Sequence, residues 1–385
     1  MPIPNIQTWL KECFGNKRAP VKIKRRKIEW INEESFQLRN NYTVKQSPNT
    51  LDTKRYIISA DINNIYSGLG CMLQILLPAW IYASMTHRTL IIDWRSNPYT
   101  RDMPEKNLFP LLFETNCLEQ LGTPCITNDS IGEIPLPQPI LGPTRPFTDE
   151  SGKSYHMGNG GISKTKMITI LRKNEDVPAL TFIPTLNSCF QLTNQFNYNS
   201  EQPAYTLEQA RTFYRALKPV PRWLNLINSF YNAHFIEKPV IGIHVRHGNG
   251  EEKYRDHFSQ RVIEDFESFI KMLAERIKSI AHQQFGDNYK VFLCTDSDIV
   301  SDALSPYFTD FITRDIWRPA PGEGIDFDAA YKMAKGSESA GNALVDIWLL
   351  SKCNLVIKTR KTAFLSPLPY LMDRPDAIVD AFDIN

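Results

Sequence analysis

The 385-residue sequence predicts an α/β protein built from two domains with parallel sheets. A chain of this length exceeds the size at which a single hydrophobic core usually stops growing, so two domains are expected. Apolar strand-like runs alternate with segments of helical period, and these runs lack an inside-outside alternation of their own, which is typical of parallel sheets covered on both faces. We expect a basic arm over residues 1–50, an N-terminal domain over 51–225 and a C-terminal domain over 226–385.

The first β-α-β unit is expected at the start of the N-terminal domain. A strand over 55–64 runs into a glycine turn, which is followed by an apolar helix over 71–85 and a second strand over 88–94. The apolar helix is shorter than the roughly 20 residues that a membrane-spanning helix needs. Between 96 and 200 the pattern is weak, and only a strand over 179–184 is predicted.

The C-terminal domain has the clearest pattern of the chain, with apolar residues at helical spacing after the first of its strands. Strands are expected at 238–246, 289–298 and 354–359, and helices at 205–219, 221–235, 258–280 and 342–352. In open parallel sheets, ligands bind beyond the carboxyl ends of the strands. We therefore look for the site at those strand ends.

Composition and charge exclude several classes of protein. The chain has 42% hydrophobic and 22% charged residues and a net charge of only +2, so no global field favours nucleic acid. Its seven cysteines are scattered and form no C-x-x-C pair, which argues against a disulfide framework or a zinc site and fits a reducing compartment. The first residues do not have the pattern of a secretory signal. We expect a cytoplasmic protein.

A basic segment lies within the N-terminal arm. Residues 17–27 read KRAPVKIKRRK and contain no acidic residue. Such a segment could contact anionic lipid at the inner face of the membrane, or a phosphorylated glycan. The alternative is a solvated terminal arm.

Three predicted strands of the C-terminal domain end in polar side chains suited to a nucleotide. They are His244, Arg246, His247 and Asn249 after the first, Thr295, Asp296 and Asp298 after the second, and Thr359, Arg360, Lys361 and Thr362 after the last. Parallel strands bring such ends to one edge of a sheet, so together these side chains would line one crevice.

Arg246 carries two alternative interpretations. Arginine grips phosphate oxygens bidentately, and the flanking Gly248 and Gly250 would let the loop approach a ligand closely, which points to a phosphate leaving group. Alternatively, Arg246 forms a salt bridge that closes the end of the sheet, with Asp296 as its partner. His244 taken alone is more often a structural histidine, and a carboxylate of the following loop could serve as a general base.

At these residues the sequence resembles the α-1,6-fucosyltransferase family, in particular its rhizobial nodulation (NodZ) branch. The resemblance rests on HVRHGNGEE at 244–252, with SGLGCMLQILLPAWIYASMTHRTLIIDWR at 67–95, FLCTDSD at 292–298 and ALVDIWLLSKCNLVIKT at 343–359 in the same order. It covers about residues 55–372 and leaves the basic arm outside.

The resemblance implies a GT-B fold, in which two Rossmann-like domains face each other across a cleft. The donor would be GDP-fucose, held mainly by the C-terminal domain without a metal or other cofactor. By position, Arg246 would clamp the β-phosphate, His244 and Asp346 would contact guanosine, and Thr362 the phosphates. His247, Asn249 and Asp296 would face the phosphate or fucose side. Asp346 lies in a helical run, where a cap or the partner of a lysine is the alternative.

The expected reaction is transfer of L-fucose from GDP-fucose to a glycan hydroxyl, by resemblance α-1,6 to N-acetylglucosamine, by an inverting displacement. In the mammalian branch of the family the base is a glutamate, and the ungapped match to it falls near Tyr254. This leaves Glu251, Glu252 or Asp256 as candidates, and we favour Glu251. The acceptor would be an oligosaccharide or a surface glycan. The alternatives are another GDP-sugar, a peptide acceptor, or a homologue that binds the nucleotide without catalysis.

Overall fold

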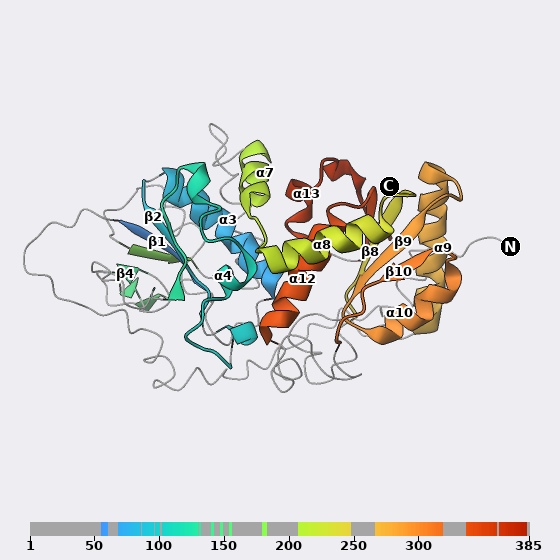
Figure 1. The fold of residues 1–385 in the computed structure, drawn as a ribbon, viewed down its shortest axis with the longest axis horizontal. Coiled ribbons are helices and arrows are strands. Elements are labelled where there is room, and N and C mark those ends of the chain that lie inside the picture. The colour runs from blue at the N-terminus through green and yellow to red at the C-terminus, as the bar shows by residue number, and fades with distance from the viewer. Residues whose placement is uncertain are drawn as a thin grey trace, which may run out of the picture.

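The computed structural model describes most of both predicted domains but not the N-terminal arm. The described residues are 55–60, 68–85, 87–95, 97–100, 102–129, 131, 140–141, 147–148, 154–155, 179–182, 207–247, 266–318, 336–359 and 362–382. They form two five-stranded sheets in which every strand pair is parallel, so the predicted α/β class with two parallel sheets is confirmed. Figure 1 shows one sheet in each half of the molecule.

The N-terminal sheet has the strand order β3-β2-β1-β7-β4. Its strands are β1 (Tyr56–Ala60), β2 (Thr89–Asp93), β3 (Cys125–Ile126), β4 (Ile140–Leu141) and β7 (Ala179–Phe182). The helices of this half are α3 (Leu69–Met85), α4 (Leu108–Leu112) and α7 (Leu207–Ala216). The predicted β-α-β unit is therefore β1-α3-β2. A short antiparallel pair, β5 (Phe147–Thr148) with β6 (Ser154–Tyr155), stands apart from the sheet.

The C-terminal sheet has the strand order β10-β9-β8-β11-β12. Its strands are β8 (Val240–Val245), β9 (Lys290–Thr295), β10 (Phe311–Thr313), β11 (Leu355–Lys358) and β12 (Ile378–Asp380). Its helices are α9 (Phe266–Phe285), α10 (Asp298–Leu304), α12 (Gly336–Leu350) and α13 (Leu368–Leu371). Relabelled in chain order, these strands run 3-2-1-4-5, which is the order of a Rossmann half-sheet.

The predicted strands of the C-terminal half are confirmed as β8, β9 and β11, all of them buried apolar runs. The helix predicted over 258–280 is α9, although residues 258–265 lie outside the described part of the chain. Neither β10 nor β12 was predicted, because each has only three residues and such runs are too short to show a period.

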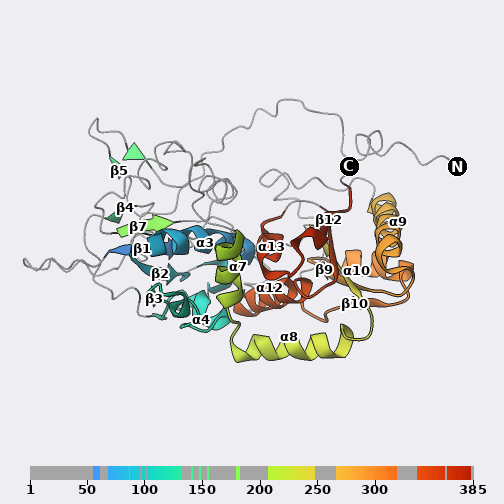
Figure 2. The same cartoon turned by 90° about the horizontal axis from the view of Figure 1, so that it is seen from above.

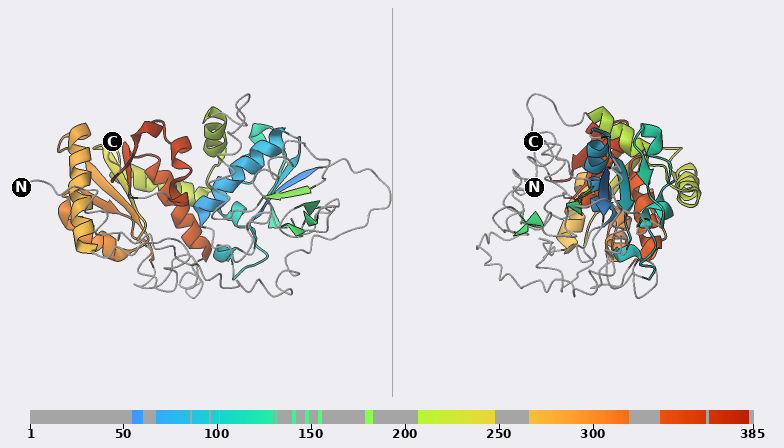
Figure 3. Two further views of the ribbon diagram at one scale, coloured as in Figure 1. Left: turned by 180° about the vertical axis from the view of Figure 1, so that it is seen from behind. Right: turned by 90° about the vertical axis from the view of Figure 1, so that its left-hand side faces the viewer.

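The helix α8 (Pro221–His234) spans the predicted domain boundary at 225/226. It begins beside the N-terminal half and runs along the C-terminal half (Figure 2). It packs against α12, which in turn packs against α4 and the 3-10 helix η1 (Pro98–Thr100) of the N-terminal half. Viewed from behind, α12 lies between the two sheets (Figure 3). No helix among the described residues is long and apolar enough to span a bilayer.

Three glycines allow close contact between the halves. A Cβ atom on Gly336 would lie 2.5 Å from the carbonyl oxygen of Tyr99, one on Gly70 would meet the backbone of Ala363, and one on Gly341 would overlap the Trp223 indole. Trp223 cannot easily move aside, because its Nε1 donates to the Leu111 carbonyl at 2.9 Å. The two halves therefore share one continuous core.

We expect Gly341→Ala to lower the free energy of unfolding by about 1–3 kcal/mol, because the added methyl overpacks the Trp223 site. Glu338→Ala, an exposed change on the same helix, serves as the control and should stay within about 0.5 kcal/mol of the parent. Urea unfolding measures both variants. Equal stability of the two would contradict the tight contact at Gly341.

Candidate functional site

The candidate site lies at the carboxyl edge of the C-terminal sheet, where β8 is hydrogen-bonded to both β9 and β11. The strand order reverses its direction between β8 and β11, which makes this the topological switch point where open α/β sheets bind ligands. The three strands predicted to end in polar side chains are therefore the neighbours β9, β8 and β11, with β8 in the centre. The structure brings together residues that are 49 and 115 positions apart in the sequence.

Asp296, which follows β9, is hydrogen-bonded to two residues that follow β8. Arg246 Nη1 donates to Asp296 Oδ2 at 2.5 Å, and the backbone N–H of His247 donates to Oδ1 at 2.8 Å. The Asp296 side chain is 7% exposed, whereas that of Arg246 is 21% exposed. The salt bridge considered from the sequence is thus present. It does not exclude a phosphate role, since a guanidinium carries five N–H donors.

His244 links β8 to the segment that follows β11. Its backbone carbonyl accepts from the N–H and the hydroxyl of Thr359, each at 3.4 Å. Its buried ring stacks on Phe364, with centroids 4.8 Å apart and planes at 12°. The Thr362 hydroxyl accepts from the Phe364 N–H at 3.0 Å and so caps the 3-10 helix η7 (Ala363–Leu365).

The same segment contacts the N-terminal half. The Ser366 hydroxyl donates to the Gly70 carbonyl at 3.3 Å, close to the start of α3. The Leu69 N–H there donates to the Tyr99 hydroxyl at 3.3 Å. The segment that follows β11 at the switch point is therefore in contact with both halves of the chain.

Asp346 lies on the same face of the sheet as His244. His244 and Cys294 are register partners in β8 and β9, so their side chains project from one face. Burial raises the pKa of the Cys294 thiol, and the charge of Asp346 adds to that rise, so the carboxylate lies near this face. Its hydrogen-bond partner is not a lysine but Arg314, whose Nη1 donates to Asp346 Oδ1 at 2.8 Å.

Burial raises the pKa of Asp346 above its usual range, and the neighbouring Arg314 and Arg318 oppose that rise. The side chains of the pair are nearly covered, with 5% of Arg314 and 11% of Asp346 exposed. A carboxylate taken out of water needs such a partner to remain ionised.

Arg314 and Arg318 are polar residues of this edge that sequence reasoning missed. They follow β10, in the run FITRDIWR at 311–318. Arg318 donates to the Thr295 carbonyl at 3.1 Å and to Asp298 at 2.8 Å, so it orders the turn that holds Asp296. The signal in the sequence was an apolar run ending in arginines, but a three-residue strand did not identify it.

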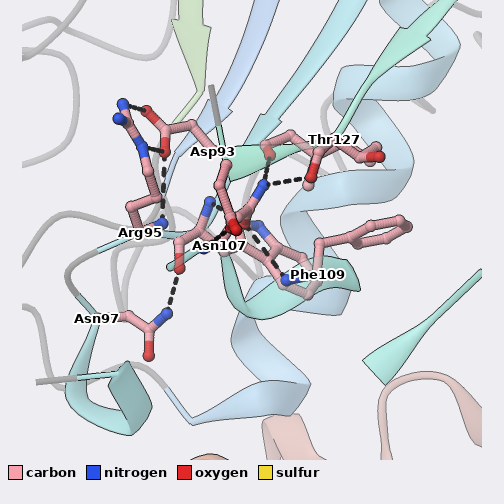
Figure 4. A network of polar contacts seen from close by, with 9 residues as sticks. Asp93, Arg95, Asn97, Asn107, Phe109 and Thr127 are labelled. Carbon is pink, nitrogen blue, oxygen red and sulfur yellow. Dashed lines mark hydrogen bonds and ion pairs between the residues drawn. The ribbon is translucent and has the colours of Figure 1, made fainter. Parts of the chain in front are cut away.

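The N-terminal half has its own ordered polar edge at the end of β2 (Figure 4). The buried Asn107 side chain donates to the carbonyls of Ile92 at 2.6 Å and Thr127 at 2.8 Å, and accepts from the Trp94 N–H at 2.9 Å. Asp93 and Arg95 form a bidentate ion pair there, with Nε–Oδ1 and Nη2–Oδ2 distances of 2.7 and 2.8 Å. The Asn107 side chain thus holds the end of β2 in place, next to the Asp93–Arg95 ion pair.

Asn249 and Glu251 lie outside the described residues, as do Glu252 and Asp256. Their predicted roles, like those of the other site residues, remain predictions. The described residues contain no group of three or more histidine, cysteine or acidic side chains that could hold a metal ion.

Comparison with known proteins places this geometry in a family. The profile described as Nodulation protein Z (NodZ) matches residues 54–149 and 204–385, which is more than half of the chain. The chain belongs to the NodZ family. Among curated NodZ proteins, that of Bradyrhizobium diazoefficiens is 29% identical over 325 residues, covering 82% of this chain and 81% of the relative. That of Sinorhizobium fredii is 27% identical and covers 80% and 88%.

A crystal structure of NodZ alpha-1,6-fucosyltransferase co-crystallised with GDP superposes with a TM-score of 0.59 at 24% identity, over 83% of this chain and 93% of that one. A crystal of NodZ alpha-1,6-fucosyltransferase soaked with GDP-fucose superposes with a TM-score of 0.57, also at 24% identity, over 83% and 93%. The expected fold class, GT-B with two Rossmann-like domains, is confirmed.

In this NodZ family member we expect Asp296→Ala to lower the free energy of unfolding by about 1–3 kcal/mol, because Arg246 and the His247 N–H lose a shared acceptor. The neighbouring Asp298→Ala should cost only about 0.5 kcal/mol, since that side chain is 63% exposed and Arg318 keeps its other acceptors. Thermal and urea unfolding without nucleotide would compare them. A larger loss for Asp298→Ala would refute the assignment of Asp296 as the organiser of this edge.

Proposed function

We propose that the protein transfers L-fucose from GDP-fucose to a glycan hydroxyl in one inverting, metal-independent displacement. The observation that carries this proposal is the position of Arg246 at the switch point of a NodZ-family fold. The family relationship and the GDP and GDP-fucose named for the NodZ crystals support GDP-fucose as the donor.

The chemistry asks for a cation where the leaving group acquires charge. The acceptor oxygen forms a bond to the anomeric carbon of fucose as the bond from that carbon to the β-phosphate oxygen breaks. GDP departs with the electron pair, and preorganised donors that face the developing charge lower the barrier. We assign this role to Arg246, which Asp296 holds in place at 2.5 Å. His247, Asn249 and Thr362 complete the phosphate and fucose side.

A base must take the proton that the acceptor hydroxyl loses. We assign it to Glu251, with Glu252 and Asp256 as the other carboxylates of that loop. At the other end of the donor, His244 and Asp346 would contact guanosine. Both residues lie on the same side of the C-terminal sheet, which supports a shared role in binding guanosine.

The acceptor is proposed to be a glycan ending in N-acetylglucosamine, fucosylated by an α-1,6 linkage and bound by the N-terminal half. The bidentate Asp93–Arg95 pair at the edge of β2 supplies polar groups there. We place the enzyme in the cytoplasm, with a weak contact to the inner membrane face through residues 17–27. Sedimentation with anionic vesicles, with and without those residues, tests that contact.

Arg246→Ala should lower kcat/KM for fucosyl transfer by about 100-fold or more, because the leaving diphosphate loses a preorganised charge. Arg246→Lys should recover only part of this loss, since lysine lacks the planar fork. GDP release from GDP-fucose in the presence of chitin oligosaccharide measures both. Arg374→Lys, at an exposed ion pair with Asp376, is the matched control with unchanged rate. Wild-type turnover by Arg246→Ala would exclude this role.

Donor identity can be tested by thermal shift with GDP-fucose, GDP-mannose, UDP-N-acetylglucosamine and free GDP. A ligand that binds only the folded state raises Tm. At 100 times its Kd it adds about 2.7 kcal/mol to the free energy of unfolding. GDP-fucose and GDP should stabilise most. Stronger stabilisation by GDP-mannose than by GDP-fucose would show that GDP-mannose is the donor. GDP binding without turnover on any glycan would favour a non-catalytic protein.

The base assignment predicts that Glu251→Gln abolishes most transfer but leaves the Kd for GDP unchanged, because the carboxylate acts on the acceptor proton and not on the nucleotide. Loss of a general base typically costs about 10²–10⁴-fold in rate. Glu252→Gln and Asp256→Asn are the paired comparisons. If one of those two is the inactive variant, the base is that residue.

A further inference from the structure

Arg314 holds two groups of α12 at once. Its Nη1 donates to the Asn342 carbonyl at 2.9 Å and to Asp346 Oδ1 at 2.8 Å, and its Nη2 donates to Asn342 Oδ1 at 2.7 Å. Arg314 directly follows β10, so these bonds tie the carboxyl edge of the sheet to one turn of the helix. They fix the rotation of α12 and the plane of the Asp346 carboxylate.

The helix α12 approaches the sheet where β8 has a glycine. A Cβ atom on Gly242 would lie 2.7 Å from Leu350 and 2.9 Å from the Cys353 thiol, so only glycine permits this approach. Gly242 and His244 are two apart in β8 and face the same way. Because α12 runs from its contact with Tyr99 toward Gly242, Asp346 lies one turn before Leu350 and therefore nearer the carboxyl edge.

The second oxygen of Asp346 has no donor within the described part of the chain. Arg314 bonds Oδ1, and the described residues give Oδ2 no hydrogen bond although the residue is only 8% exposed. Oδ2 is not one of the fully covered polar atoms, so a ligand can reach it, and an ionised carboxylate oxygen acts only as an acceptor. A ligand with adjacent N–H groups at the edge of a base would supply such donors.

We propose that Arg314 is a positioning residue for base selectivity: by fixing Asp346 Oδ1 and Asn342, it leaves Asp346 Oδ2 to accept from the N1–H and 2-amino group of a bound guanine. This inference rests on the proposed function, in which Asp346 contacts guanosine. It adds a residue from another strand, Arg314, which determines how strictly the base is read. Arg314 itself touches no substrate in this scheme.

The geometry requires arginine. A lysine at 314 would keep the positive charge but offers a single ammonium, which cannot hold the Asn342 carbonyl, Asn342 Oδ1 and Asp346 from one plane. The opposing charge that favours ionised Asp346 would remain, and only the orientation would be lost. Arg314→Lys therefore separates orientation from charge.

The test compares GDP with IDP, whose base lacks the 2-amino group, by calorimetric titration of the wild type, Arg314→Lys and Asn342→Ala. A site that bonds a substrate N–H discriminates against the analogue that lacks it, so the wild type should prefer GDP by about tenfold or more. In Arg314→Lys this ratio should fall to about two, mainly through weaker GDP binding. Asn342→Ala removes the bond from Arg314 to Asn342 Oδ1, and its preference for GDP over IDP should lie between those of the wild type and Arg314→Lys.

A purely structural role would weaken GDP and IDP by the same factor and leave the ratio unchanged, which would overturn the inference while the proposed function stands. So would a wild type that binds both nucleotides equally. Failure of the wild type to bind GDP would end both proposals. Unfolding without nucleotide checks the fold of each variant, and if Arg314→Lys does not fold, Asn342→Ala decides. Arg374→Lys, an exposed arginine of the same half, should keep the wild-type ratio.

Discussion

The central position of β8 between β9 and β11 is the constraint on which the rest of the site depends. Parallel pairing in register brings His244 beside Cys294 and Lys358, so three loops that are far apart in the chain begin at one edge. Gly242 lets α12 pack closely on one face of that strand. Without that close packing, Asp346 could not approach the face that carries His244.

Charge at this edge is distributed over two connected clusters. Asp296 holds Arg246 and the His247 N–H at the proposed phosphate end, while Arg314 holds Asp346 and Asn342 at the proposed base end. Arg318 joins them, because it donates to the Arg314 carbonyl and to the Thr295 carbonyl. In such a network, displacement of one member is transmitted to the others through fixed hydrogen bonds. The side chains proposed to bind the nucleotide are therefore held in place by hydrogen bonds within the protein.

The two halves are coupled through close backbone contacts. Gly70 meets the Ala363 backbone next to the segment capped by Thr362, and Gly336 meets Tyr99 at the start of α12. The Gly70 contact lies in the segment that follows β11 at the switch point. The N-terminal half thus contacts the segment that is proposed to bind the donor phosphates.

The sequence by itself determined the α/β class, the principal strands of the C-terminal sheet and the family, because long apolar runs and the HVRHGNGEE motif are local signals. It also named Asp296 as a partner for Arg246, since both follow buried strands. It could not identify Arg314 as the partner of Asp346. That contact joins a three-residue strand to a helix 32 residues away, and only the packing of α12 on β8 brings the two together. Pairings between distant segments depend on tertiary packing, and a single sequence contains no periodic signal for them.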